Sequence, residues 1–257
     1  MNNKKNIVIT GASSGIGSAI ALRMANPNNR LILLARNQQK LDAINALCSN
    51  KSAEVMTHSI DVTEYQKLQD LITEIDTQHP IDLIICNAGI TNCVGRKGEA
   101  ETWDEITQVV DTNLNGVLAT INPLISRMQA RKQGHIAIIS SLAAFYGMPI
   151  TPSYCASKAG LKGYGEAIRG WLKHDGIKVS MVYPGFVKSD LSDQFISDRP
   201  FMLTPEKAAN IIVNGIEKQK PSITFPFPLN LGTWFLSVMP ARIADWFMNL
   251  LFGAGKR

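Results

Sequence analysis

Short apolar segments alternate with helix-length segments along most of the chain, and this alternation limits the fold more than any other feature. Continuous apolar runs are typical of strands buried on both faces, and helices between them indicate parallel crossover connections. The pattern predicts one α/β domain over residues 1–225, built on a doubly wound parallel sheet. We expect strands at residues 6–10, 30–34, 54–59, 82–86, 135–140, 178–183 and 222–225. We expect helices at residues 15–25, 38–48, 64–77, 102–113, 114–131, 153–173 and 205–218.

Composition excludes several classes of protein. A chain of 257 residues with 45% hydrophobic and 18% charged residues buries a full core and is not disordered. Its net charge of +5 favours anionic small molecules, but no basic cluster indicates a nucleic-acid surface. The cysteines lack CxxC spacing and no apolar run is long enough to span a membrane, so we expect a cytoplasmic protein. The four histidines lack ligand spacing, so we expect no metal site.

A glycine-rich turn follows the first expected strand, in the sequence Thr-Gly-Ala-Ser-Ser-Gly-Ile-Gly at residues 10–17. Glycines there permit the tight turn and the close backbone approach that a pyrophosphate requires, and the N-terminus of the next helix attracts the anion. The turn therefore predicts a Rossmann-type dinucleotide site, with a ligand-free glycine turn as the alternative. We expect cofactor contacts from Gly11, Ser13, Ser14, Gly15, Ile16 and Gly17.

This turn resembles the cofactor motif of the short-chain dehydrogenase/reductase family. Further motifs agree in order over residues 5–225: Cys-Asn-Ala-Gly at 86–89, Asn-Leu-Asn-Gly at 113–116, Ser-Ser at 140–141, Tyr-Cys-Ala-Ser-Lys at 154–158 and Pro-Gly at 184–185. Cys86 departs from the family pattern, which has Asn there. The resemblance implies hydride transfer between a nicotinamide cofactor and a carbonyl or secondary alcohol. It also implies cofactor contacts at Asp61, Val62, Asn87, Ala88, Gly89, Pro184, Gly185, Val187 and Ser189, although Asp61 alternatively caps the next helix.

The expected catalytic residues lie near the helix at 153–173. Tyr154 and Lys158 are four residues apart and share a face, and a nearby ammonium lowers the pKa of a phenol from its usual value of about 10. The resemblance implies that Tyr154 is the general acid and base, that Ser141 binds the substrate oxygen and that Lys158 also contacts the ribose. The resemblance also implies that Asn113 holds a water that links Lys158 to solvent as a proton relay. The alternative is that Asn113 only bends the helix. Strand alternation points Ser140 to the opposite face.

The end of the second expected strand indicates which nicotinamide cofactor is bound. A carboxylate there recognises a ribose 2′-hydroxyl, whereas a 2′-phosphate requires a cation. Ala35 occupies the acidic position and Arg36 follows it. A guanidinium suits bidentate phosphate contact, so we expect NADP(H) as the cofactor, with an ordinary exposed arginine as the alternative.

Apolar residues near the expected catalytic tyrosine suggest an apolar or bulky carbonyl substrate, and simple loop packing is the alternative. The segment at 190–202, where the family places its substrate lid, is short. The substrate itself stays open among 3-oxoacyl chains, steroid-like ketones and sugar derivatives. The apolar residues in question are Phe145, Tyr146, Met148, Pro149 and Phe186.

Residues 226–257 form an apolar C-terminal extension beyond the family pattern. Residues 240–252 predict an amphipathic helix, and a similar stripe precedes it. Three roles stay open: packing on the domain or in a homo-oligomer, attachment to a membrane surface supported by the terminal Lys256-Arg257, and a substrate lid. The apolar positions are Trp234, Phe235, Val238, Ile243, Trp246, Phe247, Leu250 and Leu251, and Phe252 adds a further aromatic residue.

Two functions compete with a small-molecule reductase. A nucleotide-sensing protein would keep the fold and bind cofactor without turnover, although the intact Ser141, Tyr154 and Lys158 argue against it. A membrane-surface reductase would use the C-terminal extension to reach a lipid-linked substrate.

Overall fold

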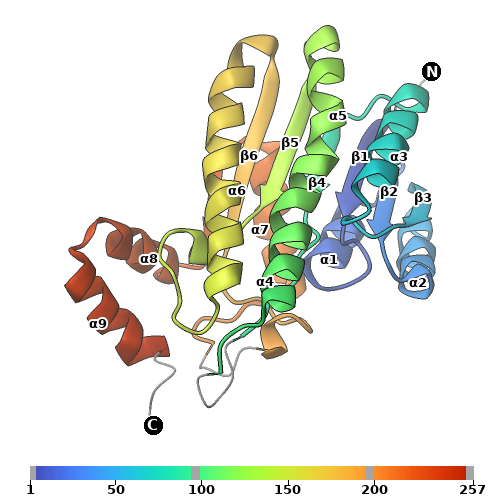
Figure 1. Ribbon diagram of the computed structural model, residues 1–257. Coiled ribbons are helices and arrows are strands. Elements are labelled where there is room, and N and C mark those ends of the chain that lie inside the picture. Colours follow the sequence, from blue (N-terminus) through green and yellow to red (C-terminus); the bar gives the residue numbers. More distant parts are fainter. Residues whose placement is uncertain (1–3, 94–98, 195–198, 253–257) are drawn as a thin grey trace.

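The computed structural model describes residues 4–93, 99–194 and 199–252, with side chains described up to residue 250. Its seven strands form one parallel sheet in the order β3-β2-β1-β4-β5-β6-β7 (Figure 1). The predicted doubly wound parallel sheet is confirmed, and the strand positions agree within a residue or two. The strands are β1 Lys5–Thr10, β2 Asn29–Ala35, β3 Glu54–Ser59, β4 Leu83–Cys86, β5 Gly134–Ile139, β6 Ile177–Pro184 and β7 Ser222–Phe225.

Helices cover both faces of the sheet (Figure 1). One face packs against α1 Gly15–Met24, α2 Gln38–Ser49 and α7 Pro205–Glu217, and the other packs against α3 Tyr65–Gln78, α5 Gly116–Arg131 and α6 Pro152–Trp171. Strand side chains alternate between the two cores, so Ile7 and Ile9 lie in the first and Val8 in the second.

The helix expected at 102–113 does not end where the sequence predicts. Helix α4 (Trp103–Val110) begins with a capping box between Thr102 and Glu105, then continues into α5 through a π-helical turn at Asp111–Asn115. A single helical run with a π turn replaces the two predicted helices. The π turn contains Asn113, and such turns are frequent at functional sites.

Strand order reverses between β1 and β4, which pair with each other while their following helices cover opposite faces. In open α/β sheets the crevice for a ligand lies at the carboxyl ends of the strands at this switch point. The loops after β1, β2, β4, β5 and β6 therefore meet at one edge of the sheet, and this edge holds most of the expected site residues.

The C-terminal extension forms a helical hairpin of α8 (Leu229–Val238) and α9 (Ala241–Phe252), which projects beside α6 (red in Figure 1). The predicted amphipathic helix at 240–252 agrees with α9. The side chains of Leu251 and Phe252 and the residues Lys256 and Arg257 lie outside the described residues. Within the described residues, no helix is both long enough and apolar enough to cross a membrane.

Candidate active site

A cavity of about 760 Å³ lies at the carboxyl edge of the sheet. Its lining comes from the loops after six strands, β1 to β6, from α6 and from the α8–α9 hairpin. Every expected site residue except Gly17 and Asn113 lines it. These two residues lie just behind the lining, where their contacts position residues that do face the cavity.

The glycine loop approaches β4 so closely that side chains are excluded. Gly11 and Gly15 adopt φ angles of +65° and +54°, in the left-handed region that favours glycine. A Cβ atom on Gly11 would lie 2.8 Å from the Cα of Ala88, and one on Gly17 would lie 2.2 Å from the carbonyl oxygen of Gly11. Ser14 makes no side-chain capping bond to α1, which leaves the first-turn N–H groups available to an anion.

Thr10 and Asn87 join the ends of β1 and β4. The Thr10 hydroxyl accepts hydrogen bonds from the N–H groups of Asn87 (3.0 Å) and Ala88 (3.1 Å). The Asn87 amide donates to the carbonyl oxygens of Thr10 and Gly11, both at 3.1 Å. The expected Asn87 thus holds the glycine loop in place. Sequence reasoning missed Thr10, whose signal is a polar residue at the end of an apolar strand.

Asn113 is fully buried in the π turn. Its amide oxygen accepts from the Ile90 N–H (2.8 Å), and its nitrogen donates to the Ile90 carbonyl (2.9 Å) and to Ser157 Oγ (3.1 Å). The side chain therefore ties the segment after β4 to α6. The relay water expected at Asn113 stays a prediction.

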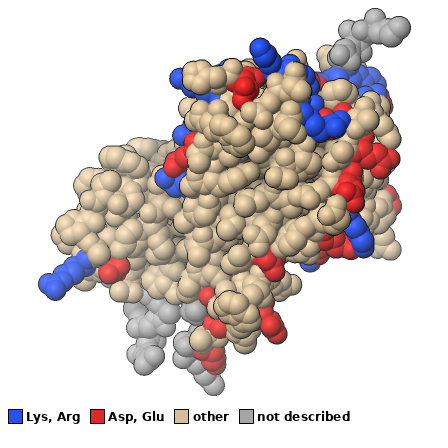
Figure 2. All heavy atoms as spheres, turned by 45° about the horizontal axis from the view of Figure 1, so that its top comes forward, with Lys and Arg blue, Asp and Glu red and all other residues tan. Residues whose placement is uncertain are grey.

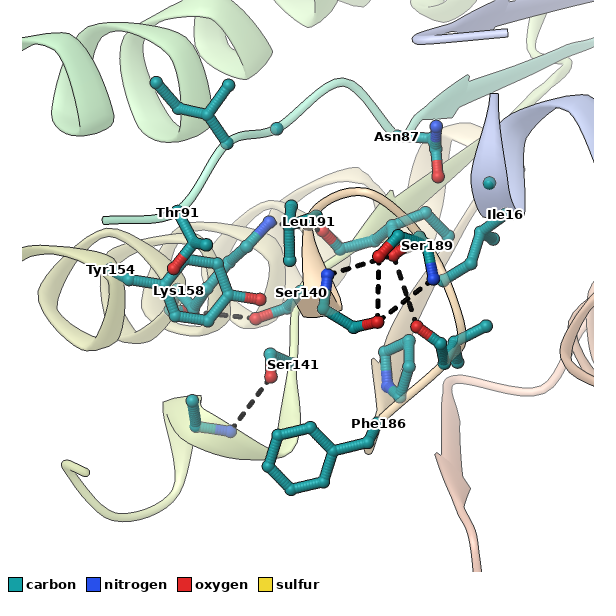
Figure 3. Close-up of a pocket in the computed structure, with 18 of the residues that line it drawn as sticks. Ile16, Asn87, Thr91, Ser140, Ser141, Tyr154, Lys158, Phe186, Ser189 and Leu191 are labelled. Carbon is teal, nitrogen blue, oxygen red and sulfur yellow. Dashed lines mark hydrogen bonds between the residues drawn. The ribbon is translucent and has the colours of Figure 1, made fainter. Parts of the chain in front are cut away.

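Tyr154 and Lys158 lie next to each other in the lining of the cavity, with Ser141 close by (Figure 3). Lys158 Nζ lies 5.6 Å from the centroid of the Tyr154 ring and donates to the Ile139 carbonyl at 3.1 Å. The Tyr154 hydroxyl shares a hydrogen bond with Ser141, whose hydroxyl also accepts from the Ala143 N–H.

Burial shifts the pKa values of both Tyr154 and Lys158. It raises the pKa of Tyr154 to about 12, although the Ser141 hydrogen bond opposes this shift, and it lowers the pKa of Lys158 to about 8. Burial therefore outweighs any effect of Lys158 on this phenol, and the pKa of Tyr154 is raised where the sequence predicted a lowered one. The ammonium lies against the ring face and donates to a main-chain carbonyl, so desolvation of the phenol dominates.

Arg36 lines the cavity with a side chain that is 63% exposed. Its guanidinium lies 3.6 Å from Oδ2 of Asp61. The other Asp61 oxygen accepts from the N–H and hydroxyl of Thr63, which forms a local turn before α3 instead of capping that helix. Lys40 in α2 is a second cation in the lining, and sequence reasoning missed it although it lies only four residues after Arg36.

The turn after β6 closes against the glycine loop. Ser189 and Ser192 exchange three hydrogen bonds through their hydroxyls and main-chain groups, and the Ser189 hydroxyl also donates to the Val187 carbonyl. A Cβ atom on Gly15 would lie 3.4 Å from Cβ of Ser189, so the two loops touch.

The apolar residues noted in the sequence divide between lining and packing. Tyr146, Met148 and Phe186 line the cavity, whereas Phe145 packs on the Tyr183 ring at 4.8 Å between centroids. Pro149 is not part of the lining. The sequence left the role of the C-terminal extension open, and the structure adds hairpin residues to the lining, among them Leu229, Thr233, Leu236, Met239, Phe247 and Met248.

Comparison with known proteins identifies the family. The model of the short chain dehydrogenase family matches residues 5–200. The chain belongs to this family. It is 32% identical to an uncharacterized oxidoreductase of Myxococcus xanthus over 93% of this chain and 94% of that protein. It is also 32% identical to a 3-oxoacyl-acyl-carrier-protein reductase of Rickettsia bellii, over 84% and 91% of the two chains.

Solved structures of this oxidoreductase family share the fold. A short-chain dehydrogenase from Sphingobium yanoikuyae, solved in complex with NADPH, superposes with a TM-score of 0.81 at 22% identity, covering 95% of each chain.

Within the described residues, no cluster of histidine, cysteine and carboxylate side chains could hold a metal ion.

Proposed function

We propose that this short-chain dehydrogenase uses NADP(H) to interconvert a ketone and a secondary alcohol. The observation that supports this most directly is the pair of buried Tyr154 and half-buried Ser141, whose hydroxyl groups share a hydrogen bond on the wall of the cavity. One hydroxyl comes from α6 and the other from the end of β5, so both can hydrogen-bond to the same substrate oxygen. Lys158 lies beside the tyrosine.

The cavity lining fits a nicotinamide dinucleotide phosphate. The close backbone approach at Gly11 and the free N-terminus of α1 suit its pyrophosphate. Arg36 and Lys40 supply positive charge beyond β2 for a 2′-phosphate, where the acidic residue of an NAD site is absent. The Sphingobium neighbour was solved with NADPH, which supports the same assignment. When bound, the nicotinamide supplies or accepts the hydride.

The protein's own residues handle the proton. The Ser141 hydroxyl orients the substrate oxygen by a hydrogen bond, and Tyr154 transfers its phenolic proton to that oxygen as carbon receives the hydride, so that ketone becomes alcohol. A pKa of about 12 keeps Tyr154 protonated at neutral pH, which favours reduction. Lys158, with a pKa of about 8, is still largely an ammonium at pH 7 and stabilises the phenolate that remains.

A panel of ketones and alcohols, assayed with NADPH, NADH and their oxidised forms, tests the proposal. We expect ketone-dependent oxidation of NADPH and weaker use of NADH. NADPH binding without turnover of any substrate would favour the nucleotide sensor instead, and equal use of the two cofactors would contradict the role of Arg36.

A further inference from the structure

The cavity has two ends of different chemistry. The end near the glycine loop contains the charged side chains of Arg36, Lys40 and Asp61. The α8–α9 hairpin lines another part of the cavity, and none of the hairpin residues in this lining is charged. At the surface, Figure 2 shows few charged side chains over the projecting end of the molecule, apart from its tip, and more of them along the upper and right edges of the view.

One stripe of α8 makes this apolar wall. Leu229, Thr233 and Leu236 are spaced four and three residues apart, line the cavity and are half-buried. Residues on the opposite side of the helix, such as Leu231 at 56% and Val238 at 61%, are exposed. The only hydroxyl in the stripe, on Thr233, donates to the carbonyl of Asn230 at 3.1 Å.

Contacts at both ends hold the hairpin against the catalytic centre. A Cβ atom on Gly185, just after β6, would lie 2.8 Å from Pro226 and 3.1 Å from Leu229, so the start of α8 packs on this turn. The Tyr146 hydroxyl donates to Asp245 of α9 at 2.7 Å. Ala244 and Met248, one turn apart on α9, are buried. These contacts place the wall beside the turn after β6 and the segment before α6, which also line the cavity.

We propose that the inner face of the α8–α9 hairpin is a subsite for a long hydrocarbon group, so that the substrate is a ketone or secondary alcohol with an extended apolar chain. This inference rests on the proposed function, because Tyr154 marks where the carbonyl binds. The subsite lies beyond residues 5–200, the part that the family model matches. Sugar hydroxyls would lack partners along this wall, and unpaired buried hydroxyls are costly.

A chain-length series tests the subsite. Straight-chain methyl ketones from 2-butanone to 2-decanone are assayed with NADPH, and each methylene that leaves water should raise kcat/KM by about fourfold until the wall is filled. We expect a ratio between 2-decanone and 2-butanone of about a hundredfold or more. Binding of 2-decanol to the protein with NADPH, measured by calorimetry, gives a readout that needs no turnover.

Two variants of one helix provide the matched comparison. Leu236→Glu places a carboxylate on the inner stripe, and Leu231→Glu places the same group on the exposed side. We expect Leu236→Glu to reduce the 2-decanone to 2-butanone ratio to less than about tenfold and to abolish 2-decanol binding, since the apolar contacts are lost. Leu231→Glu should keep both. Thr233→Phe, which fills the wall without charge, is the second variant if Leu236→Glu fails to fold.

The outcomes separate this subsite from the proposed function. Turnover of 2-butanone with a flat series would overturn the subsite and leave the oxidoreductase intact. No turnover of any ketone, with 2-decanol binding that only Leu236→Glu or Thr233→Phe removes, would support the subsite and contradict the reductase. A ratio that Leu231→Glu and Leu236→Glu reduce equally would also overturn the subsite.

Discussion

Ser140 and Ser141 are neighbours at the end of β5, yet their hydroxyl groups have different partners. Ser140 donates to the Lys158 carbonyl at 2.9 Å, which fixes α6 on the strand, while Ser141 bonds with the Tyr154 hydroxyl. Alternation of side chains along the strand end separates a structural hydroxyl from one that faces the cavity. Each candidate catalytic residue similarly has a neighbour that holds it, as Ser157 and Ile90 hold Asn113.

Replacing Tyr154 by Phe removes the transferable proton and keeps the ring. We expect ketone-dependent NADPH oxidation to fall at least about 10²–10⁴-fold, the usual contribution of general acid–base catalysis, while NADPH affinity changes little. Steady-state kinetics and a fluorescence titration of NADPH measure the two effects. Turnover close to that of the wild type would contradict the proton-donor role.

Replacing Arg36 by Ala should change cofactor preference. The side chain is exposed beside Asp61, and its loss removes a charged partner of the 2′-phosphate, so we expect NADPH affinity to weaken by about 1.5–3 kcal/mol with little change for NADH. Titrations of both cofactors measure this, with Arg23→Ala on an exposed site of α1 as the control. Equal losses for the two cofactors would contradict the assignment.

At the scale of elements, the site is a meeting of loop ends that helices hold in place. The π turn between α4 and α5 brings Asn113 to the segment after β4, and the turn after β6 touches the glycine loop. Helices α8 and α9 are held differently, since few of their residues are buried and α9 is tied to the segment before α6 by the Tyr146–Asp245 bond.

Removing that bond should loosen α9. In Tyr146→Phe we expect faster chymotrypsin cleavage within residues 229–250 and little change in global stability, because the bond is exposed. Limited proteolysis with mass spectrometry locates the cuts. Asp245→Asn keeps an acceptor oxygen and should behave like the wild type. Unchanged cleavage in Tyr146→Phe would show that packing alone holds the hairpin.

At the scale of the whole molecule, stability depends on buried groups far from the cavity. His135 in β5 is buried, lies 2.9 Å from Ser180 Oγ, and has its pKa lowered by burial and then by Lys5 and Lys178, to about 4. Ser180 in turn donates to the Lys220 carbonyl. The folded protein therefore holds this histidine neutral where the unfolded chain would protonate it.

Acidification should consequently destabilise the fold through His135. Its folded pKa lies below the unfolded value of 6.5, so stability is full above that pH and falls as the pH drops from about 6.5 to 4, by about 3 kcal/mol in all. Urea unfolding of the wild type and His135→Gln across this range measures the effect. The difference between the two proteins removes contributions from other groups, including His58. Parallel pH profiles would contradict it.

The outer face of the hairpin leaves apolar side chains exposed, with Trp246 at 61% and Leu250 at 69%. Patches of this kind are unusual on monomers, so we expect the intact protein to self-associate or to bind lipid vesicles. Trp246→Glu with Leu250→Glu should abolish this association and keep NADPH binding, since neither residue lines the cavity. Light scattering and vesicle co-sedimentation measure it, with exposed Trp171→Glu on α6 as the control. A monomer that ignores vesicles would contradict the expectation.

The sequence by itself determined the features of the protein that depend on local conformation. Apolar runs predicted the strands, and the four-residue spacing of Tyr154 and Lys158 predicted their shared face. The glycines after β1 predicted the tight turn, and two of them do adopt positive φ. These features depend on a residue and its near neighbours along the chain, so the sequence contains them in full.

Only the tertiary structure decided which groups are buried together. It gave Tyr154 a raised pKa where the sequence predicted a lowered one, and it engaged the side chain of Asn113 with Ile90 and Ser157. It also divided α8 into two stripes: one that contains Leu229 lines the cavity, and one that contains Leu231 is exposed. Desolvation and cavity lining depend on residues distant in sequence, and no local pattern specifies which of them will meet.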